Sequence, residues 1–403
     1  MKSAYSAVTL AAALLLLTTP SACKGETPVR ISFTGDIIMH IPVKTAAAQN
    51  NKKDTTLKTS LNNNGFDHLF EPLKSRLKKS DILMGNLEFP VAPPYTSKPR
   101  IFNCPPQVLQ SLKDTGFTMV TLANNHMLDQ GTRGVAATIN HVEKAGLQFI
   151  GVHRNEALAR RGLVVKKQGI RIGFLAYTGV SNYPIPRSRS FHINWFYHKK
   201  KVLKDIEEIK KRCDYLILTV HTGVEYALKP QKRDTALMKA YAEAGVDLII
   251  GHHPHIIQPV EKITCKDGRS AYIFYSLGNF ISNQSSTHPL PARGLATSTR
   301  DSILVTCLLK KDNMRIIPEF EVTPILTRNT RDRRTWKRTI QTWTIDDFKA
   351  SLKKSPDLTQ KNYRVKKTLK GLAKRTAALY HIINGAGSYK EITIKAETEK
   401  AAN

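Results

Sequence analysis

The sequence predicts a layered α/β domain. Strand-like and helix-like segments alternate through most of the chain, which favours helices layered on a sheet over a helical bundle or a β-sandwich. Several strand-like runs are apolar throughout, as in YLILTV at residues 215–220, and strands of this kind are covered on both faces. The chain has 403 residues, of which 41% are hydrophobic, enough to bury a large core.

The expected elements follow in order from the first β-branched run, VRISF at residues 29–33. Prolines crowd residues 90–106, which are expected to form a loop, and glycine ends helices at Gly116 and Gly146. Strands are expected at residues 29–33, 81–84, 117–122, 148–151, 163–165, 170–177, 215–220, 246–250, 271–276, 302–309 and 315–322. Helices are expected at residues 70–79, 107–115, 134–145, 202–211 and 235–244.

Residues 1–22 are predicted to be a signal peptide for export. Lys2 is the only early charge, residues 7–17 are largely apolar, and small residues precede Cys23, which is the layout of a secretory signal. The apolar run is too short to span a bilayer comfortably. The small residues also predict lipidation of Cys23, with residues 23–28 as a tether to a membrane. Cleavage without lipidation would give a periplasmic or extracellular protein instead.

The other four cysteines are widely spaced, and the sequence has no CxxC pair. This excludes a zinc knuckle and a thioredoxin-like site. An exported protein can form disulfides, because its environment is oxidising. Cys213 and Cys307, however, lie beside apolar strand-like runs, where buried thiols are at least as good an interpretation.

The chain is strongly basic, with 62 Lys and Arg against 32 Asp and Glu and a formal net charge of +30. Such a surface attracts polyanions. Because an exported protein rarely meets nucleic acid, we expect a membrane surface or an acidic polymer as the partner, and no nucleic acid. A proteome that is generally rich in Lys and Arg is the alternative explanation.

The composition shifts near residue 323, and residues 326–403 are predicted to form a basic C-terminal extension. Six of the residues from Arg328 to Arg338 are Lys or Arg. Residues 346–352 and 365–382 are expected to be helical. This extension is predicted either to pack on the main domain or to lie on a membrane surface.

Polar side chains follow the ends of five expected strands. They are Asp36; Asn86 with Glu88; Asn125 with His126; His221; and His252, His253 and His255. In open α/β sheets, ligands bind at the carboxyl ends of the strands. Oxygen and imidazole ligands without thiolates suit divalent Mn, Fe, Zn or Mg, as one ion or as a pair, and paired metals hydrolyse phosphoesters.

Each position alone has an ordinary structural explanation. An aspartate such as Asp36 commonly forms a turn. A histidine such as His221 can be a hydrogen-bonded residue of the core. The string Gly-His-His-Pro-His at residues 251–255 differs, because three histidines within four residues are costly to bury unless they bind a ligand. Histidine is also the commonest metal ligand. The joint placement at strand ends therefore favours a metal site.

Six segments of the chain resemble the CapA family, which is named for poly-γ-glutamate capsule synthesis. They are TGDIIMH, GNLEFPV, ANNHMLDQGTRG, VHTGVEY, GHHPHIIQPVE and YSLGNFI, in the family's order over residues 34–281. The family is a branch of the calcineurin-like metallophosphoesterase superfamily. The resemblance thus implies an αββα fold, a two-sheet core flanked by helices, with the site at the sheet edges. We assign this domain to residues 29–325.

The resemblance also implies roles for single residues. The implied metal ligands are Asp36, Asn86, Glu88, Asn125, His221, His253 and His255. Glu88, or else Asn86, stands where the superfamily has its bridging carboxylate. His126 is implied as the general acid or as the group that holds the transition-state charge, with Asp129 as its nearby acid. His252 would lie behind the ligands.

The chain differs from the superfamily pattern at several places. Ile38 stands where the superfamily has a histidine two residues after its aspartate, and His40 follows two residues later. Met127 stands where an acidic residue usually follows the motif histidine. These differences leave a one-metal site and a two-metal site both open. Glu225 and Asn279 are interpreted as structural residues near the pocket.

Two functions compete at this point. The first is an exported metal-dependent hydrolase that acts on a phosphoester or a related bond. The second is a non-catalytic member of an envelope-polymer assembly, which binds an acidic chain next to other synthesis proteins. A DNA-binding module is a third reading of the charge, but the export signal disfavours it, and the sequence has no helix-turn-helix or zinc-finger spacing.

Overall fold

The computed structural model describes residues 27–51, 64–186, 190–284, 298–313, 315–354, 362–384 and 392–394. The expected signal peptide and Cys23 lie outside these ranges. Within the described ranges, no helix is long and apolar enough to cross a membrane.

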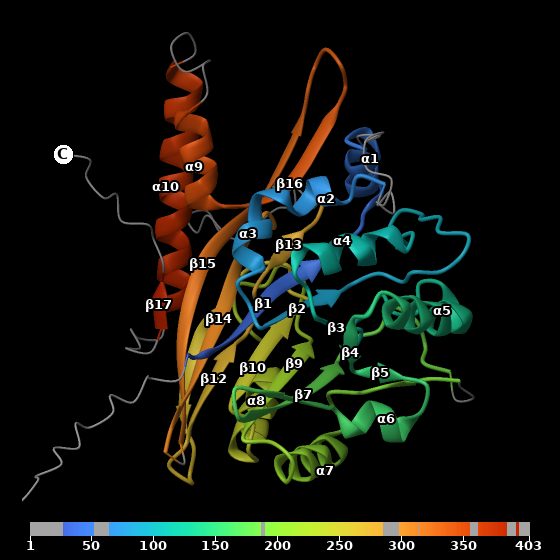
Figure 1. Ribbon diagram of the computed structural model, residues 1–403, viewed down its shortest axis with the longest axis vertical. Helices are drawn as coiled ribbons and strands as arrows, with labels where there is room; N and C mark the ends of the chain where they lie inside the picture. The colour runs from blue at the N-terminus through green and yellow to red at the C-terminus, as the bar shows by residue number, and fades with distance from the viewer. Residues whose placement is uncertain are drawn as a thin grey trace, which may run out of the picture.

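Two β-sheets lie against each other at the centre of the molecule, and helices cover their outer faces (Figure 1). The larger sheet runs in the order β16 (Arg338–Thr344), β15 (Arg315–Arg331), β14 (Asp301–Asp312), β1 (Val29–Ile37), β2 (Ile82–Leu87), β3 (Met119–Thr121) and β4 (Gln148–Ile150). Beside it, β13 (Asn279–Ile281) pairs with β1, and β17 (Ile392–Ile394) pairs with β15.

The second sheet runs in the order β11 (Val260–Thr264), β12 (Ser270–Phe274), β10 (Leu248–His252), β9 (Tyr215–His221), β7 (Ile170–Thr178) and β6 (Leu163–Lys167). A short ladder joins β5 (Val152–His153) to β8 (His192–Ile193). The predicted α/β class with a two-sheet core flanked by helices is confirmed.

The helices fall into groups along the chain. The described ones are α1 (Ile41–Gln49), α2 (Asp67–Phe70), η1 (Glu71–Leu73), α3 (Lys74–Leu77), α4 (Gln107–Thr115), α5 (Gly131–Lys144), α6 (Glu156–Arg161), α7 (Lys199–Lys210), α8 (Lys232–Glu243), α9 (Ile345–Lys353) and α10 (Asn362–Asn384). Figure 1 shows α2 to α5 near the larger sheet, α7 and α8 outside the second sheet, and α9 beside α10 at one edge.

The surroundings of strand β9 explain why its sequence does not alternate between apolar and polar residues. Tyr215 and Ile217 belong to the large core between the sheets, whereas Leu216 and Leu218 pack in a second cluster with apolar side chains of α7 and α8. Successive side chains of a strand point to opposite faces, so both faces of β9 are buried. The predicted coverage on both faces is therefore present.

The sheet also crosses the boundary expected at residue 325. Strand β15 continues to Arg331, and β16 pairs with it in antiparallel register from Ile325 opposite Thr344 to Arg331 opposite Arg338. The start of the basic extension is therefore part of the larger sheet. The two helices expected in the extension are present as α9 and α10.

The four cysteines in the described part of the chain are free thiols, and all four are buried. Burial raises the pKa of the Cys213 thiol to about 11, and it raises the pKa of Cys104 and Cys307 further. The structure thus agrees with the interpretation as buried thiols rather than with disulfides among these four cysteines.

Parallel pairing brings the functional strand ends together. β1 runs parallel to β2, and β9 runs parallel to β10, so their carboxyl ends meet at neighbouring edges of the two sheets. At the end of β1 the backbone approaches β13 closely, with the Asp36 N–H donating to the Gly278 carbonyl at 3.0 Å. Gly35 makes this approach possible, because an added Cβ would lie 1.9 Å from that carbonyl oxygen.

Replacing Gly35 by alanine is expected to lower the free energy of unfolding by about 3 kcal/mol. The clash is with backbone, which cannot move aside as a side chain can. Gly371→Ala in α10 is the control, because a Cβ there meets nothing within 4 Å and alanine favours a helix. Urea unfolding followed by circular dichroism measures both; equal unfolding free energies for Gly35→Ala and the parent would contradict the prediction.

Candidate active site

Two buried carboxylates lie at the centre of the site. Asp36 is next to last in β1, and Glu88 follows the last residue of β2; neither is exposed to solvent. A buried carboxylate is costly unless it is hydrogen-bonded or paired. Nδ2 of Asn86 donates to Asp36 Oδ1 at 2.8 Å and to Glu88 Oε2 at 3.2 Å. One amide therefore joins the two acids.

Four buried histidines face these acids from the second sheet. His221 ends β9, and His252 ends β10 as its register partner. Nδ1 of His252 lies 3.1 Å from Asp36 Oδ1, and Nδ1 of His255 lies 3.1 Å from Asp36 Oδ2. The His253 backbone N–H also donates to Oδ2, at 3.3 Å. Asp36 thus connects the two sheets at this edge.

Amide side chains fix the ring of His221. Its Nδ1 lies 3.1 Å from Asn86 Nδ2, and its Nε2 lies 2.9 Å from Asn125 Oδ1. Asn124, next in the same loop, donates to Asn86 Oδ1 at 3.1 Å and to the Leu87 carbonyl at 2.9 Å. The loop after β3 is therefore tied to the end of β2.

The ionisation of these groups follows from their burial. Burial alone would raise the pKa of Asp36, but its close contacts with the imidazoles of His252 and His255 outweigh that and hold its pKa well below the usual range. Burial raises the pKa of Glu88 well above its usual range, and the nearby Asp36 carboxylate adds to the rise. A second negative charge beside Asp36 is thus unfavourable unless a cation offsets it.

The histidines are held neutral. Burial lowers the pKa of His221 well below its usual range, with a contribution from His253. Burial also lowers the pKa of His253 to about 3, and repulsion from His255 adds to that effect. A neutral imidazole keeps a free lone pair, which is the form that binds a metal ion.

The donor atoms fit a divalent cation. Asp36, Glu88 and His255 bring three ligand atoms within 4.8 Å of one another. Glu88 Oε1 is buried without a hydrogen-bond partner among the described residues, and so is His253 Nδ1. Glu88 Oε1 lies 3.9 Å from His221 Nε2 and 3.8 Å from His255 Nε2. Those distances are too long for hydrogen bonds, but two ligands of one ion lie roughly 3–4 Å apart.

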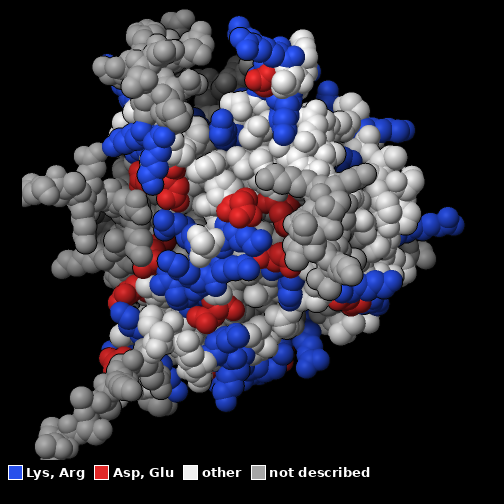
Figure 2. All heavy atoms as spheres, turned by 45° about the horizontal axis from the view of Figure 1, so that its top comes forward, with Lys and Arg blue, Asp and Glu red and all other residues white. Residues whose placement is uncertain are grey.

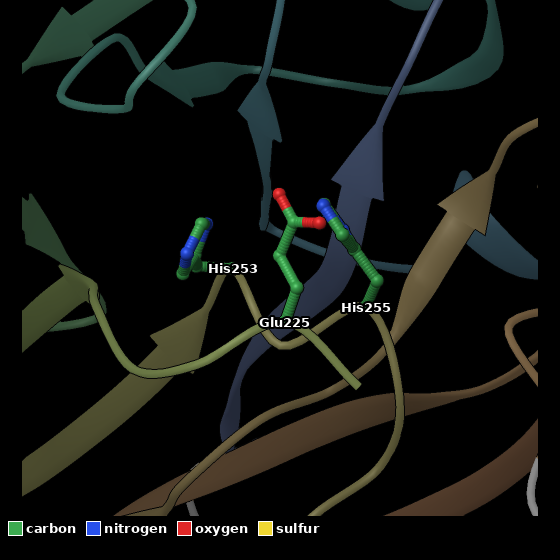
Figure 3. Close-up of side chains that lie close together, drawn as sticks. All are labelled: Glu225, His253 and His255. Carbon is green, nitrogen blue, oxygen red and sulfur yellow. The ribbon is translucent and has the colours of Figure 1, made fainter. Parts of the chain in front are cut away.

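Glu225 extends the set of possible ligands. Its carboxylate, His253 and His255 also bring their ligand atoms within 4.8 Å of one another. Figure 3 shows the carboxylate reaching up beside the His255 ring, with His253 across from it. Glu225 comes from the loop after β9, and the Tyr226 N–H ties that loop to the Pro254 carbonyl at 2.8 Å.

The two loops that carry these ligands hold a strained backbone. Tyr226, His253 and His255 have φ angles of +64°, +96° and +59°, a region that bulky residues rarely adopt. Each such residue costs of order 1–3 kcal/mol. Strain of this kind persists where the surroundings impose it, and it is common at binding and catalytic sites.

A cavity of about 680 Å³ opens above the acids and histidines, and its wall includes His126, Phe102 and Arg100. Nδ1 of His126 lies 2.7 Å from Asp129 Oδ2, which also accepts the Phe102 backbone N–H at 2.5 Å. Because a carboxylate only accepts, it sets Nδ1 as the donor and leaves Nε2 as the acceptor. The Phe102 ring stacks on the imidazole at 4.1 Å.

The structure brings all the sequence-predicted site residues into this one region. Around the carboxylates of Asp36 and Glu88 lie the other five expected ligands, Asn86, Asn125, His221, His253 and His255. His126 lies in the cavity wall, held by Asp129. His252 contacts Asp36 directly. His40 also lines the cavity, but it accepts the Asn283 backbone N–H at 3.2 Å and belongs to neither group of possible ligands.

Two residues that the sequence analysis interprets as structural lie in direct contact with the site or among its possible ligands. Glu225 was interpreted as structural, although the string VHTGVEY places a carboxylate four residues after His221. Asn279 lies opposite Asp36 in the β1–β13 pairing and has its Oδ1 3.0 Å from His255 Nδ1. The signal for both was their presence in family-like segments; their neighbours depend on the fold.

Comparison with known proteins decides the family. Residues 30–284 match the family described as bacterial capsule synthesis protein PGA_cap. The chain belongs to this capsule synthesis family. It is 30% identical over 318 residues to the PGA biosynthesis protein CapA of Bacillus subtilis (strain 168), covering 75% of each chain.

Two further similarities complete the comparison. The chain is 30% identical over 273 residues to the capsule biosynthesis protein CapA of Bacillus anthracis, covering 65% of this chain and 62% of that protein. The 5'-nucleotidase from Candida albicans SC5314 aligns with a TM-score of 0.42 and 10% identity, over 87% of this chain and 58% of that structure. The family match over residues 30–284 and the identity to the Bacillus subtilis protein confirm the predicted membership of the CapA family.

In this member of the capsule synthesis family, Glu225→Gln is expected to weaken Mn²⁺ binding about 10–100-fold. The reason is that the amide lacks the charge of the carboxylate, which lies near His253 and His255. Isothermal titration of the metal-free protein measures the dissociation constant. Glu207→Gln on the exposed face of α7 is the matched control. An unchanged Mn²⁺ affinity in Glu225→Gln would exclude the carboxylate as a ligand.

The metal-free protein is expected to lose stability in acid through its buried histidines. The pKa of His253 is about 3 when folded and about 6.5 when unfolded, so below about pH 6.5 the unfolded chain binds a proton that the folded chain does not. His253 thus contributes a loss of about 2 kcal/mol between about pH 7.5 and about pH 5.

The raised pKa of Glu88 acts in the opposite direction, so the informative quantity is the difference between variants. The loss of unfolding free energy in urea should be smaller in His253→Gln than in the parent. His198→Gln, at an exposed histidine before α7, should behave as the parent. An equal loss in all three proteins would show that His253 is not held neutral.

Proposed function

We propose that this chain is an exported CapA-family protein that acts in the synthesis of a capsule or envelope polymer of the poly-γ-glutamate type, with metal-dependent hydrolase chemistry. The observation that carries the proposal is the convergence of Asp36 and Glu88 with His221, His253 and His255 beneath a cavity that also holds His126. The names of the two Bacillus relatives refer to PGA and capsule biosynthesis, which supports the choice of polymer.

The donor set suits one or two divalent ions of Mn, Fe, Zn or Mg. Asp36, Glu88 and His255 would hold one ion, and Glu225 with His253 would hold a second beside it. A metal ion bound there would act as a Lewis acid, activating water and polarising the bond that breaks.

The chain's own residues would supply the proton and the orientation. Asp129 accepts from His126 Nδ1 and would stabilise the imidazolium. Nε2, once it has taken up a proton from solvent, would pass that proton to the leaving oxygen as the phosphorus–oxygen bond breaks. The Phe102 ring covers one face of the imidazole and keeps its orientation fixed. Water supplies the new oxygen on phosphorus, so the reaction proposed is hydrolysis.

The rim of the cavity suits an anionic substrate. Arg100 lines it, is exposed, and sits at φ +61° in a tight turn closed by backbone hydrogen bonds between Lys98 and Ile101. A guanidinium at this place would bind a phosphate or a carboxylate of the polymer. This proposal includes export by the signal at residues 1–22, and lipid anchoring at Cys23.

A non-catalytic subunit that binds an anionic polymer is the alternative function. The net charge of +30 favours it, and Figure 2 shows Lys and Arg side chains spread over much of one face, with acidic groups between them. Such a subunit would bind the polymer within an assembly of synthesis proteins without turning it over. Nucleic acid is not part of either proposal.

Hydrolysis of bis-p-nitrophenyl phosphate by the chain from residue 24 onward, with Mn²⁺ added, is the test. We expect turnover that falls about 10²–10⁴-fold in His126→Ala, because the transition state then lacks the imidazole that would stabilise its charge. Asp129→Asn should fall less, because the imidazole remains but loses the carboxylate that sets its tautomer. Mn²⁺ should bind both variants as it binds the parent.

His198→Gln is the control for loss of an imidazole elsewhere, and its turnover should equal that of the parent. Bound Mn²⁺ without any turnover by the parent would reject the hydrolase and favour the polymer-binding subunit. Turnover that His126→Ala leaves unchanged would reject the role of His126 alone.

A further inference from the structure

The hairpin formed by β15 and β16 projects beyond the body of the molecule. Figure 1 shows it at the top of the view, past α2 and α1. The last register pair is Arg331 opposite Arg338, and a turn of six residues joins them. We define residues 331–338 as the hairpin tip.

The tip is an ordered turn. The Asp332 N–H donates to the Lys337 carbonyl at 2.8 Å. Oδ1 of Asp332 accepts the backbone N–H of Arg334 at 2.9 Å and that of Thr335 at 2.7 Å. The one carboxylate of the tip is therefore used to fix the turn, and the tip needs little ordering to bind a partner.

Trp336 stands out of this turn. It is 61% exposed, the most exposed large hydrophobic residue in the described part of the chain. Its φ is +57°, a conformation that is unfavourable for a bulky aromatic residue. The Arg331 guanidinium lies 4.1 Å from the centre of its ring. Nε of Arg331 also donates to the Trp336 carbonyl, at 3.4 Å. The indole is thus held in an unfavourable backbone conformation with most of its surface in solvent.

The rest of the tip is cationic. Arg333, Arg334 and Lys337 are exposed, and their side chains have no acidic partner among the described residues. Figure 2, which brings this end of the molecule forward, shows Lys and Arg side chains on the projection at the top of the view. A partner that fits the tip would offer negative charge to the Lys and Arg side chains and an apolar layer to the indole ring.

We propose that the hairpin tip binds the surface of an anionic lipid bilayer, with Trp336 at the headgroup level and the basic side chains on the phosphates. Tryptophan prefers the membrane–water interface because its ring is apolar and its N–H is polar. Clustered Lys and Arg next to it bind anionic headgroups. This proposal does not rest on the hydrolase.

The shape of the tip favours a bilayer over a soluble polymer. Sites for a ligand chain are concave and enclose it, whereas the tip is a projecting turn with an aromatic ring exposed. A polymer of carboxylates would use the cations and gain little from an exposed indole. The two partners therefore differ in how much binding depends on Trp336.

Flotation of the chain from residue 24 onward, which keeps every described residue, tests the proposal. The vesicles are phosphatidylcholine alone or with a quarter of phosphatidylglycerol, at about 150 mM salt to screen the overall charge. We expect binding to the anionic vesicles alone. Trp336→Ala should lower the partition coefficient about tenfold, and Arg333→Gln with Arg334→Gln on the order of thirtyfold.

Matched controls separate the tip from the net charge of the chain. Lys199→Gln with Lys200→Gln removes two exposed charges from α7, and Ile317→Ala removes an exposed apolar side chain from β15; both should bind as the parent. Brominated phosphatidylglycerol should quench tryptophan emission in the parent and lose that quenching in Trp336→Phe.

Three results would overturn the proposal. The first is binding of Trp336→Ala equal to that of the parent. The second is a loss in the Lys199 and Lys200 double variant as large as the loss in the tip variant. The third is tight binding of soluble polyglutamate that depends on Arg333 and Arg334 but not on Trp336, which would assign the tip to a polymer.

Discussion

Two carboxylates, Asp36 and Glu88, are buried side by side at the edge where the two sheets meet, and the surrounding structure follows from that constraint. The pKa of Asp36 is held low because the imidazoles of His252 and His255 lie against its carboxylate. Glu88 resists ionisation because it is buried beside Asp36. Burying two such groups is tolerable only with donors, neutral imidazoles or a cation nearby. The polar residues of the site meet that need and define a place for a divalent ion.

The fold supplies these partners from distant parts of the chain. Strands β1 and β2 bring the acids, and β9 and β10 bring the histidines, because parallel strands end at the same edge. Gly35 lets β1 approach Gly278 closely enough for the Asp36 N–H to bond there. The strained loops around Tyr226 and His253 are then stabilised by the large core beneath them. The position of the acids depends on packing far from the chemistry.

In the described part of the chain, the cavity and the exposed hairpin tip are separate features. The cavity has a rim with Arg100 and a floor of acids and histidines, which suits an anionic group carried to a metal site. The projecting tip around Trp336 leaves the larger sheet by β15 and β16. Strands β15 and β16 belong to the same sheet as β1 and β2, so the tip keeps a fixed orientation relative to the site.

The sequence by itself determined the α/β class, the principal strands and the residues at their ends. Apolar runs such as residues 215–220 and polar residues such as Asp36 directly after strands are local signals, and local signals can be read without a fold. It did not give β16, because a short strand with basic flanks has no distinct pattern. Nor did it give the place of Glu225 in the site, because its histidine neighbours come from the loop after β10. Tertiary structure decided three further features. They are the amide that hydrogen-bonds to both acids, the free state of the thiols and the direction of the hairpin. These depend on distances between residues that lie tens to hundreds of positions apart, and packing alone sets those distances.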